Sequence, residues 1–581
     1  MPPAAKPRIE GRALAKELWR LTVPYWTSND GKWGALLLGT AIALQLGSVY
    51  ANVLVSRAQR DVGNVLGAHD AGGFGRAIVL MAGAMLLTVV VPAYASWVQQ
   101  RLQIRWREWL TGYFVERWVS PQAFCLADLH RDAVDNPDVR ISEDIRDFVA
   151  SALGLSLSLL SAVVTLASFA AMLWNISSGW QIPIAGKMVE IPGLLLWVAV
   201  AFALFSMWIT NRVGRRLVPI NFDRIRLEAD FRYGLVRYRD HVEAVALMRG
   251  SEVERRGASG RFKKVVVNFC ELVGAQRNLA ILTQGIGAAN SLVPLVVAGL
   301  AYLADVLTLG VIAQTRFAYG QVAGGLAWFV NAYQEIARWR ANIERLSSFS
   351  DAIDATARVF DATKIRFERE EPARIALEDL HVEAPRGRVL LEHASAVVTP
   401  GERVAITGPP GSGRTTLMRA LAGIWPFGGG RIGEPPRDRM FFLGQQPYLP
   451  IGSLREAIAY PSPASTFSDD TISGALRAFG LADLVPRLDE VQPWDQMLST
   501  HQQQRLALSR VVLHAPEWVL LDEATSSLDA ATEQKVYETL VESVPTAAIV
   551  SVAERPGVLA LLPRRLAFVS GSAGTVRLEA A

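Results

Sequence analysis

Long apolar stretches alternate with charged segments through the first 350 residues. Six of these stretches approach the roughly 20 apolar residues that a helix needs to cross a hydrocarbon core of about 30 Å. They cover approximately residues 33–55, 77–98, 148–174, 191–210, 279–303 and 311–333. The pattern therefore predicts a membrane domain with six spans.

The sixth stretch is the least apolar, because Gln314, Arg316, Gln321 and Asn331 interrupt it. Unpaired polar groups in lipid cost several kcal/mol each, so such a helix should turn them toward a bundle interior or toward water. This makes the stretch a candidate for lining a pathway. The alternative is an amphipathic helix that lies outside the membrane.

Two segments between the spans are long and rich in arginine. RLQIRWREWLTGYFVERWV and RLEADFRYGLVRYRDHVEAVALMRG mix apolar and charged residues at helical spacing, which predicts that membrane helices continue beyond the bilayer. The loops after the first, third and fifth spans are short and poorer in Lys and Arg. The positive-inside rule places the arginine-rich segments and both termini in the cytoplasm.

After residue 346 the pattern changes to short aliphatic and β-branched runs broken by Pro and Gly. IALEDLHVEAP, RVLLEHASAVV and ERVAITG are typical of strands, and they alternate with helical patterns. This predicts an α/β domain with a largely parallel sheet. We expect a transmembrane domain over residues 1–350, a linker over 351–374 and a soluble domain over 375–581.

Composition agrees with a membrane protein of more than one domain: 51% of the 581 residues are hydrophobic. The net charge is only +4, and the basic residues cluster between spans, which is a topology signal and not a nucleic-acid footprint. Cys125 and Cys270 are the only cysteines, so we expect two buried, inert thiols and no disulfide framework. No signal peptide is predicted, because charges run through the N-terminal residues.

A glycine-rich loop follows one predicted strand and opens a helix in ERVAITGPPGSGRTTLMRALAG. It has the spacing G-x-x-x-x-G-K-[ST], with Arg414 in the place of the lysine. Glycines let backbone N–H groups point at phosphates, and a helix N-terminus adds positive partial charge. The residues predicted to bind nucleotide here are Gly408, Gly411, Ser412, Gly413, Arg414, Thr415 and Thr416, and the Thr415 hydroxyl is also a predicted Mg²⁺ ligand.

A second motif lies about a hundred residues further on, in WVLLDEATSSLD. An apolar strand ends at Asp522, a candidate Mg²⁺ ligand, and Glu523 beside it is a candidate base for an attacking water.

The order of GPPGSGRTTL, FLGQQPYLP, LSTHQQQRLALSR, LLDEATSSLD and VSVAER resembles the ATP-binding cassette of ABC transporters. NPDVRISEDI and EADFRYGLVRYRDHVEA resemble coupling segments of the branch that holds SbmA/BacA-like peptide transporters and subfamily D. The resemblance covers approximately residues 18–560. It implies an exporter-like six-span α-helical membrane domain followed by an α/β P-loop cassette, in a half-transporter that acts as a dimer with two ATPs between the cassettes.

The resemblance also implies roles for three further residues. Gln445 corresponds to the glutamine that senses Mg²⁺, which makes it a predicted catalytic and metal-binding residue. Ser499 corresponds to the signature serine that touches the partner's ATP. Asp529 corresponds to the aspartate of the D-loop. No adenine-stacking aromatic is evident around residues 386–391.

Four positions depart from the family pattern. Arg414 replaces the loop lysine, Thr500 and His501 replace the signature glycines, and Glu554 replaces the switch histidine. An Arg-for-Lys change is not conservative, and a carboxylate near a γ-phosphate would repel it. We predict binding of ATP and Mg²⁺ with weakened hydrolysis, and ordinary turnover remains the alternative. In the dimer that the resemblance implies, each ATP would lie between the glycine loop of one chain and the signature of the other. Because this chain alters both motifs, pairing with an unaltered partner would not give one intact site.

The sequence thus favours an ATP-linked transporter of a bulky amphipathic or peptide-like solute, such as a peptide, a cobalamin-like molecule or an acyl conjugate. We expect it in the lipid of a bacterial cytoplasmic membrane, paired with a second half-transporter, with a homodimer slightly favoured over a heterodimer. The alternative is an ATP-binding, non-hydrolysing regulator or scaffold. A proton-driven mechanism is disfavoured, because the first five spans contain no Asp or Glu.

Overall fold

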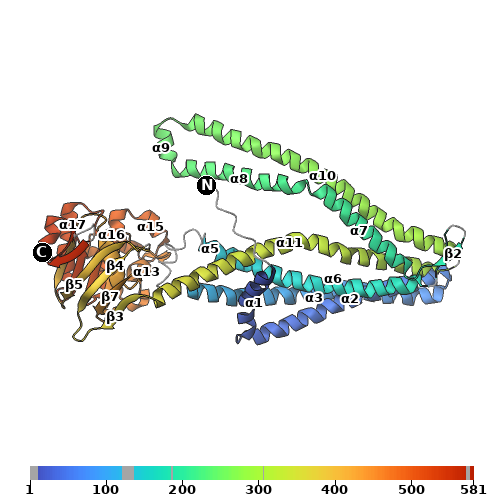
Figure 1. Ribbon diagram of the computed structural model, residues 1–581, viewed down its shortest axis with the longest axis horizontal. Coiled ribbons are helices and arrows are strands. Elements are labelled where there is room, and N and C mark those ends of the chain that lie inside the picture. The colour runs from blue at the N-terminus through green and yellow to red at the C-terminus, as the bar shows by residue number, and fades with distance from the viewer. Residues whose placement is uncertain are drawn as a thin grey trace. The chain divides into compact units, whose positions relative to one another are not determined.

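The structure is a computed structural model of the chain (Figure 1). It describes residues 11–120, 136–178, 180–184, 187–304, 306–385, 387–570 and 576–580. The chain divides into two compact units, one formed by residues 1–115 and 136–347 and the other by residues 116–135 and 348–581.

The first unit is helical. Its helices are α1 (Gly11–Thr27), α2 (Gly31–Gly67), α3 (Ala71–Trp118), α5 (Pro137–Val139), the π-helix η1 (Arg140–Asp144), α6 (Ile145–Ser177), α7 (Leu194–Gly214), α8 (Leu217–Asp240), α9 (Val242–Leu247), α10 (Ser251–Leu303) and α11 (Leu309–Asp361). The strands β1 (Gln181–Ile184) and β2 (Lys187–Glu190) form an antiparallel hairpin between α6 and α7, which the sequence did not predict.

Five of the six predicted spans fall within one helix each, and the fourth, 191–210, begins three residues before α7. Among the described residues, five helices are long and apolar enough to cross a membrane: α2, α3, α6 together with the turns before it, α7 and α10. The sixth predicted span forms the first part of α11, which does not reach the same apolarity.

The polar residues at the start of α11 are divided between the bundle interior and its surface. Gln314 is buried, and its Nε2 contacts the sulfur of Met172 on α6 at 3.5 Å. Arg316 is exposed, and the side chain of Asn331 lies outside the described residues.

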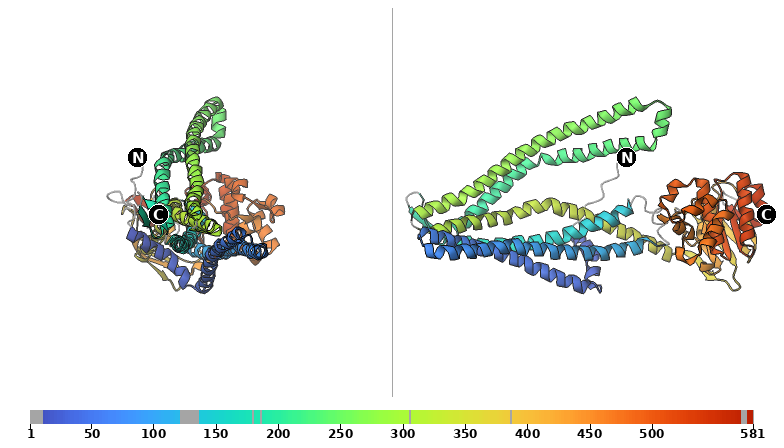
Figure 2. Two further views of the ribbon diagram at one scale, coloured as in Figure 1. Left: turned by 90° about the vertical axis from the view of Figure 1, so that its right-hand side faces the viewer. Right: turned by 180° about the vertical axis from the view of Figure 1, so that it is seen from behind.

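The membrane helices continue far beyond their apolar stretches, as predicted. At 1.5 Å per residue, the 48 residues of α3 and the 53 of α10 are about 70–80 Å long. The second arginine-rich segment is interrupted, since α7 ends at Gly214 and α8 and α9 follow as separate helices. Figure 2 shows α8 and α10 side by side, joined by α9.

The prediction that both cysteines are buried is wrong for Cys270, which is exposed on α10. Val266 and Phe269, which lie near it on α10, are exposed as well. Cys125 lies outside the described residues.

The second unit contains a six-stranded sheet in the order β14-β13-β6-β12-β11-β8. Its strands are β6 (Arg403–Thr407), β8 (Met440–Leu443), β11 (Trp518–Asp522), β12 (Ala548–Val552), β13 (Arg564–Ser570) and β14 (Val576–Ala580). All neighbours pair parallel except β13 and β14. This confirms the predicted parallel α/β architecture.

A second, four-stranded sheet has the order β3-β7-β4-β5 and is mostly antiparallel. Its strands are β3 (Lys364–Arg369), β4 (Ile375–Glu383), β5 (Val389–Val398) and β7 (Gly428–Glu434). The sequence predicts strands at β4 and β5 but not the second, antiparallel sheet that they form. Only a short turn joins them, so they pair as an antiparallel hairpin, whereas parallel neighbours need a long crossover.

Helices and short elements complete this unit. They are α12 (Arg414–Leu421), η2 (Arg437–Arg439), β9 (Gly452–Ser453), α13 (Leu454–Ala459), η3 (Ala464–Thr466), α14 (Asp469–Ala478), η4 (Ala482–Arg487), β10 (Val491–Gln492), α15 (Trp494–Met497), α16 (Thr500–His514), α17 (Ala530–Ser543) and α18 (Pro556–Leu559). Residues of α13, α14 and α16 share an apolar core that includes Leu454, Leu476 and Leu506.

Candidate nucleotide site

Three neighbouring parallel strands bring the predicted site residues together. β12 lies between β6 and β11, and the carboxyl ends of parallel strands meet at one edge of the sheet. The glycine loop follows β6, Asp522 ends β11, and Glu554 follows β12. Residues from distant parts of the sequence thus meet at this edge.

The glycine loop requires backbone conformations that favour glycine. Gly408, Gly411 and Gly413 have φ angles of +150°, +77° and +101°. A Cβ on Gly408 would lie 2.6 Å from the Cβ of Phe568, so this position has no room for a side chain. Gly413 precedes the first residue of α12, whose N-terminal N–H groups have no carbonyl partner within the helix.

Ser412 adds a polar group to this loop. Its Oγ is buried and has no hydrogen-bond partner among the described residues. A glycine cradle, a helix N-terminus and an unpaired hydroxyl together match the donor set that phosphate groups need.

Arg414 joins two carboxylates. Its side chain is only 6% exposed, and its Nη2 lies 3.1 Å from Oε1 of Glu523. Its Nη1 donates to Oε1 of Glu554, so one planar guanidinium bridges the ends of β11 and β12. The two residues that depart most from the family pattern at this edge are therefore partners with opposite charges.

Thr415 and Asp522 form the second contact between the loop and β11. The Thr415 Oγ1 donates to Oδ1 of Asp522 at 3.1 Å. Burial raises the pKa of Asp522, the hydrogen bond from Thr415 lowers it, and the charge of Glu523 raises it further. A hydroxyl and a carboxylate so placed suit a hard cation such as Mg²⁺.

Glu523 has a φ of +50°, an uncommon conformation for a residue other than glycine. Such backbone strain clusters at functional sites.

Gln504 on α16 is a residue that sequence reasoning missed. Its side chain is buried, and its Nε2 donates to the backbone oxygen of Gln445 at 3.2 Å. Its Oε1 accepts from the backbone N–H of Ser527 at 3.2 Å, so one amide ties the loop of Gln445 to the loop after Glu523. The signal was its spacing with the apolar residues Ala507, Leu508 and Val511, which puts a glutamine on the buried face of the helix.

Ser499 and Asp529 make their hydrogen bonds at the starts of helices. Ser499 caps α16 in a capping box with Gln502, and Asp529 caps α17. Hydrogen bonds from Thr532 and Ala531 lower the pKa of Asp529.

Four other residues that the sequence analysis named also lie in the second unit. Thr500 and His501 are exposed in the first turn of α16, the side chain of Gln445 is exposed, and Thr416 lies in α12.

Comparison with known proteins identifies the family. The family description "ABC transporter transmembrane region 2" matches residues 18–303, and "ABC transporter" matches residues 391–526. An ABC transporter ATP-binding protein of Synechocystis is 33% identical over 90% of this chain and 78% of its own length.

Two other relatives match nearly end to end. The inner membrane ABC transporter ATP-binding protein YddA of Escherichia coli is 28% identical over 94% of this chain and 96% of its own length. The human lysosomal cobalamin transporter ABCD4 is 26% identical over 92% of this chain and 91% of its own length.

The chain belongs to the ABC transporters. It is a multi-pass membrane protein in which a helical transmembrane domain is followed by an ATP-binding cassette, the arrangement of a half-transporter.

Proposed function

We propose that the chain is an ATP-linked transporter of a bulky amphipathic solute, and that it works as a dimer of half-transporters. The observation that carries this proposal is the set of contacts from the glycine loop to the end of β11, where Thr415 reaches Asp522 and Arg414 reaches Glu523. A loop that only capped a helix would have no reason to engage these two carboxylates.

The residues present fit ATP and Mg²⁺, which would supply the phosphoryl group and neutralise its charge. Thr415, Asp522 and Gln445 would hold the metal ion. Glu523 would accept a proton at its carboxylate from the attacking water. The phosphates would bind to the glycine loop, that is to Gly408, Gly411, Ser412, Gly413, Arg414, Thr415 and Thr416.

Arg414 must change partners for this to happen. In the structure its guanidinium binds Glu523 and Glu554, so an arriving phosphate competes with two carboxylates for one cation. We propose that Glu554 restrains Arg414 in this way and weakens nucleotide binding, and that hydrolysis is slowed because Glu523 is engaged.

The composite site would need a second chain. Ser499, with Thr500 and His501 after it, and Asp529 lie at exposed helix starts where a partner's nucleotide could reach them. Among dimers we favour the homodimer slightly, since closed two-fold assemblies are the commonest.

The solute class and the orientation are inferred from a relative and from the charge pattern of the sequence. The name of ABCD4 states a cobalamin substrate, which suits a large amphipathic molecule, and peptides and acyl conjugates share that character. Arginine-rich segments between the spans favour a cytoplasmic position for both termini and the cassette. A bacterial cytoplasmic membrane agrees with the inner-membrane relative.

One observation favours a second candidate, a regulator or scaffold that binds ATP without hydrolysing it. Arg414 neutralises Glu523, and a paired carboxylate is a poorer base than a free one.

Proteoliposomes test the transport proposal. The chain and a Glu523→Gln variant would be reconstituted, and ATP-dependent accumulation would be measured for a fluorescent peptide, a fluorescent cobalamin and a fluorescent acyl conjugate. Accumulation of one probe by the chain but not by the variant supports transport. Equal accumulation of all three by both proteins favours the regulator.

A further inference from the structure

A cavity of about 350 Å³ lies between α6 and α11 in the first unit. Its lining residues are Ala150, Ser151, Gly154, Leu155, Ser158, Trp328, Ala332 and Glu335. Its size falls in the range of about 300–1,000 Å³ that small-molecule sites occupy.

The α6 side of the cavity is built from small residues at helical spacing. Ala150, Gly154 and Ser158 follow each other at intervals of four, so they share one face of the helix. A Cβ built on Gly154 would meet nothing within 4 Å, which means that the space in front of this face is open. The Ser158 hydroxyl is used locally, since it donates to the backbone oxygen of Leu155 at 3.3 Å.

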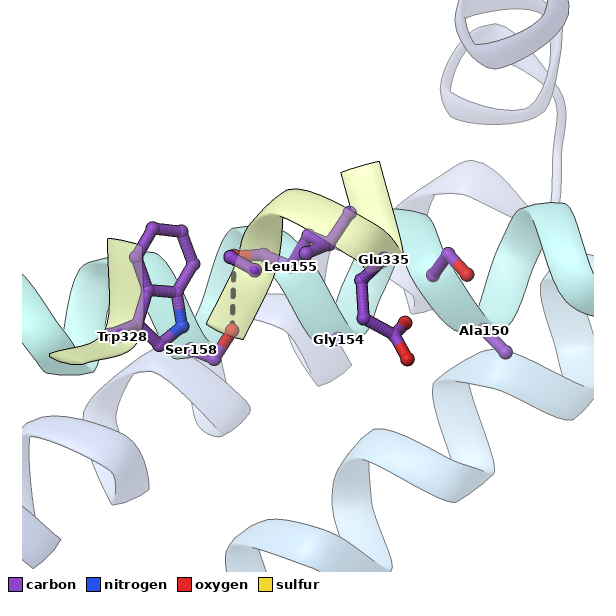
Figure 3. Close-up of a pocket in the computed structure, with 8 residues that line it drawn as sticks. Ala150, Gly154, Leu155, Ser158, Trp328 and Glu335 are labelled. Atoms are coloured by element: carbon purple, nitrogen blue, oxygen red, sulfur yellow. Dashed lines mark hydrogen bonds between the residues drawn. The ribbon is translucent and has the colours of Figure 1, made fainter. Parts of the chain in front are cut away.

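The α11 side carries the distinctive chemistry. Figure 3 shows Trp328 and Glu335 projecting from this helix beside α6. They are seven residues apart, with Ala332 between them, so they lie on one face at a separation of about 10 Å along the axis. Glu335 has no hydrogen-bond or ion-pair partner among the described residues.

A carboxylate without a partner beside an apolar wall favours a particular ligand. Glu335 is exposed and lies two residues beyond the sixth predicted span, near the membrane boundary, so its charge is accessible to water or to a cation. An ammonium or guanidinium would satisfy the carboxylate, and an indole attracts either apolar groups or a cation. An anionic solute would be repelled.

We propose that this cavity binds the cationic end of an amphipathic solute, with the charge on Glu335 and the apolar part along Trp328 and Leu155. The inference rests on the proposed function and narrows its substrate class to amphipathic cations whose charged and apolar parts are about 10 Å apart. Glu335 and Trp328 are then residues that determine specificity.

Two matched probes test the proposal with the full chain in lipid nanodiscs without ATP. One probe is a dansyl group joined through an alkyl chain to an ammonium, and the other ends in a neutral amide. Fluorescence anisotropy gives both affinities, with empty nanodiscs as the background. The chain is expected to bind the ammonium probe about tenfold more tightly than the amide.

Variants assign that preference to the cavity. Glu335→Gln should abolish the preference for the ammonium probe and keep the affinity for the amide probe. Glu335→Asp should retain most of the preference. Gly154→Leu should fill the open space and weaken both probes. Glu254→Gln, an exposed carboxylate at the start of α10, is the control and should change neither affinity.

Equal affinities for the two probes would overturn the proposal. Such a result would mean that the Glu335 carboxylate carries no available charge, for example because a cation from a second copy pairs with it. A preference that survives Glu335→Gln, or a loss of both probes in that variant, would also overturn it. ATP turnover is measured separately: absent turnover with an intact preference contradicts transport, and intact turnover without the preference contradicts only this site.

Discussion

The guanidinium of Arg414 bonds to the carboxylate of Glu554, so two substitutions relative to the family pattern compensate each other. The sequence alone suggests that each weakens phosphate binding independently. In the structure the two substitutions act together, because the Arg414 guanidinium binds the Glu554 carboxylate. A histidine at position 554 would supply no carboxylate.

This pair predicts the effect of Glu554→Gln. Removing the carboxylate frees one arm of Arg414 for phosphate and removes a repelling charge, so ATP should bind roughly three- to tenfold more tightly. Equilibrium binding of a fluorescent ATP analogue to the purified chain measures this effect. Glu554→Asp is the control, since it keeps the charge. Unchanged or weaker binding in the Gln variant would mean that Glu554 does not restrain Arg414.

Gln504 should act on turnover through the loops that it joins. Gln504→Glu keeps an acceptor for the N–H of Ser527 but places an oxygen against the carbonyl of Gln445, so we expect about 1–3 kcal/mol of local destabilisation. ATP affinity should change little while turnover falls. Comparing ATP binding with phosphate release measures this split, and equal losses in both would indicate a merely structural role.

Asp144 should stabilise the first unit. Its buried carboxylate contacts Arg345 at 2.6 and 2.9 Å and Arg140 at 2.9 Å. Asp144→Asn leaves the two cations poorly compensated, and we expect a loss of about 1–3 kcal/mol and a lower unfolding temperature in detergent. Asp223→Asn, which breaks an exposed pair with Arg226, is the matched control. Equal unfolding temperatures for the two variants would contradict this role.

His514 should make the cassette sensitive to acid. Burial lowers its pKa, and its Nε2 lies 2.9 Å from the backbone oxygen of Ala459. A depressed pKa favours the neutral ring in the folded state, so its contribution to stability is present above the unfolded value of about 6.5 and is lost as the pH falls through the folded pKa.

Hydrogen exchange of α16 can measure this effect. Protection should fall between about pH 7.5 and about pH 5, after correction for intrinsic exchange, and His514→Gln should reduce that fall. An identical fall in the variant would show that other groups are responsible.

Local patterns in the sequence predict much of this fold. The five most apolar stretches became long helices, and the strand, glycine loop and helix around Gly413 formed in the predicted order. These features depend on periodicity and on glycine spacing, which nearby residues determine.

Features that depend on distant contacts could not be predicted in this way. The sequence places Arg414 and Glu554 140 residues apart, and only the order of β6, β12 and β11 in the sheet makes them neighbours. The contacts of Gln504 with Gln445 and Ser527 also join distant parts of the chain. The hairpin of β4 and β5 is local, and its short turn is a signal that the sequence analysis did not use. The exposure of Cys270 depends on which helices cover α10.

The most direct test of the account is steady-state ATP turnover by the purified chain in lipid nanodiscs, with Glu523→Gln as the blank. The account predicts slow turnover that is clearly above the blank and that rises in Glu554→Gln, because freeing Arg414 strengthens the hold on phosphate. Turnover equal to the blank in both proteins, with ATP still bound, would contradict an ATP-driven transporter.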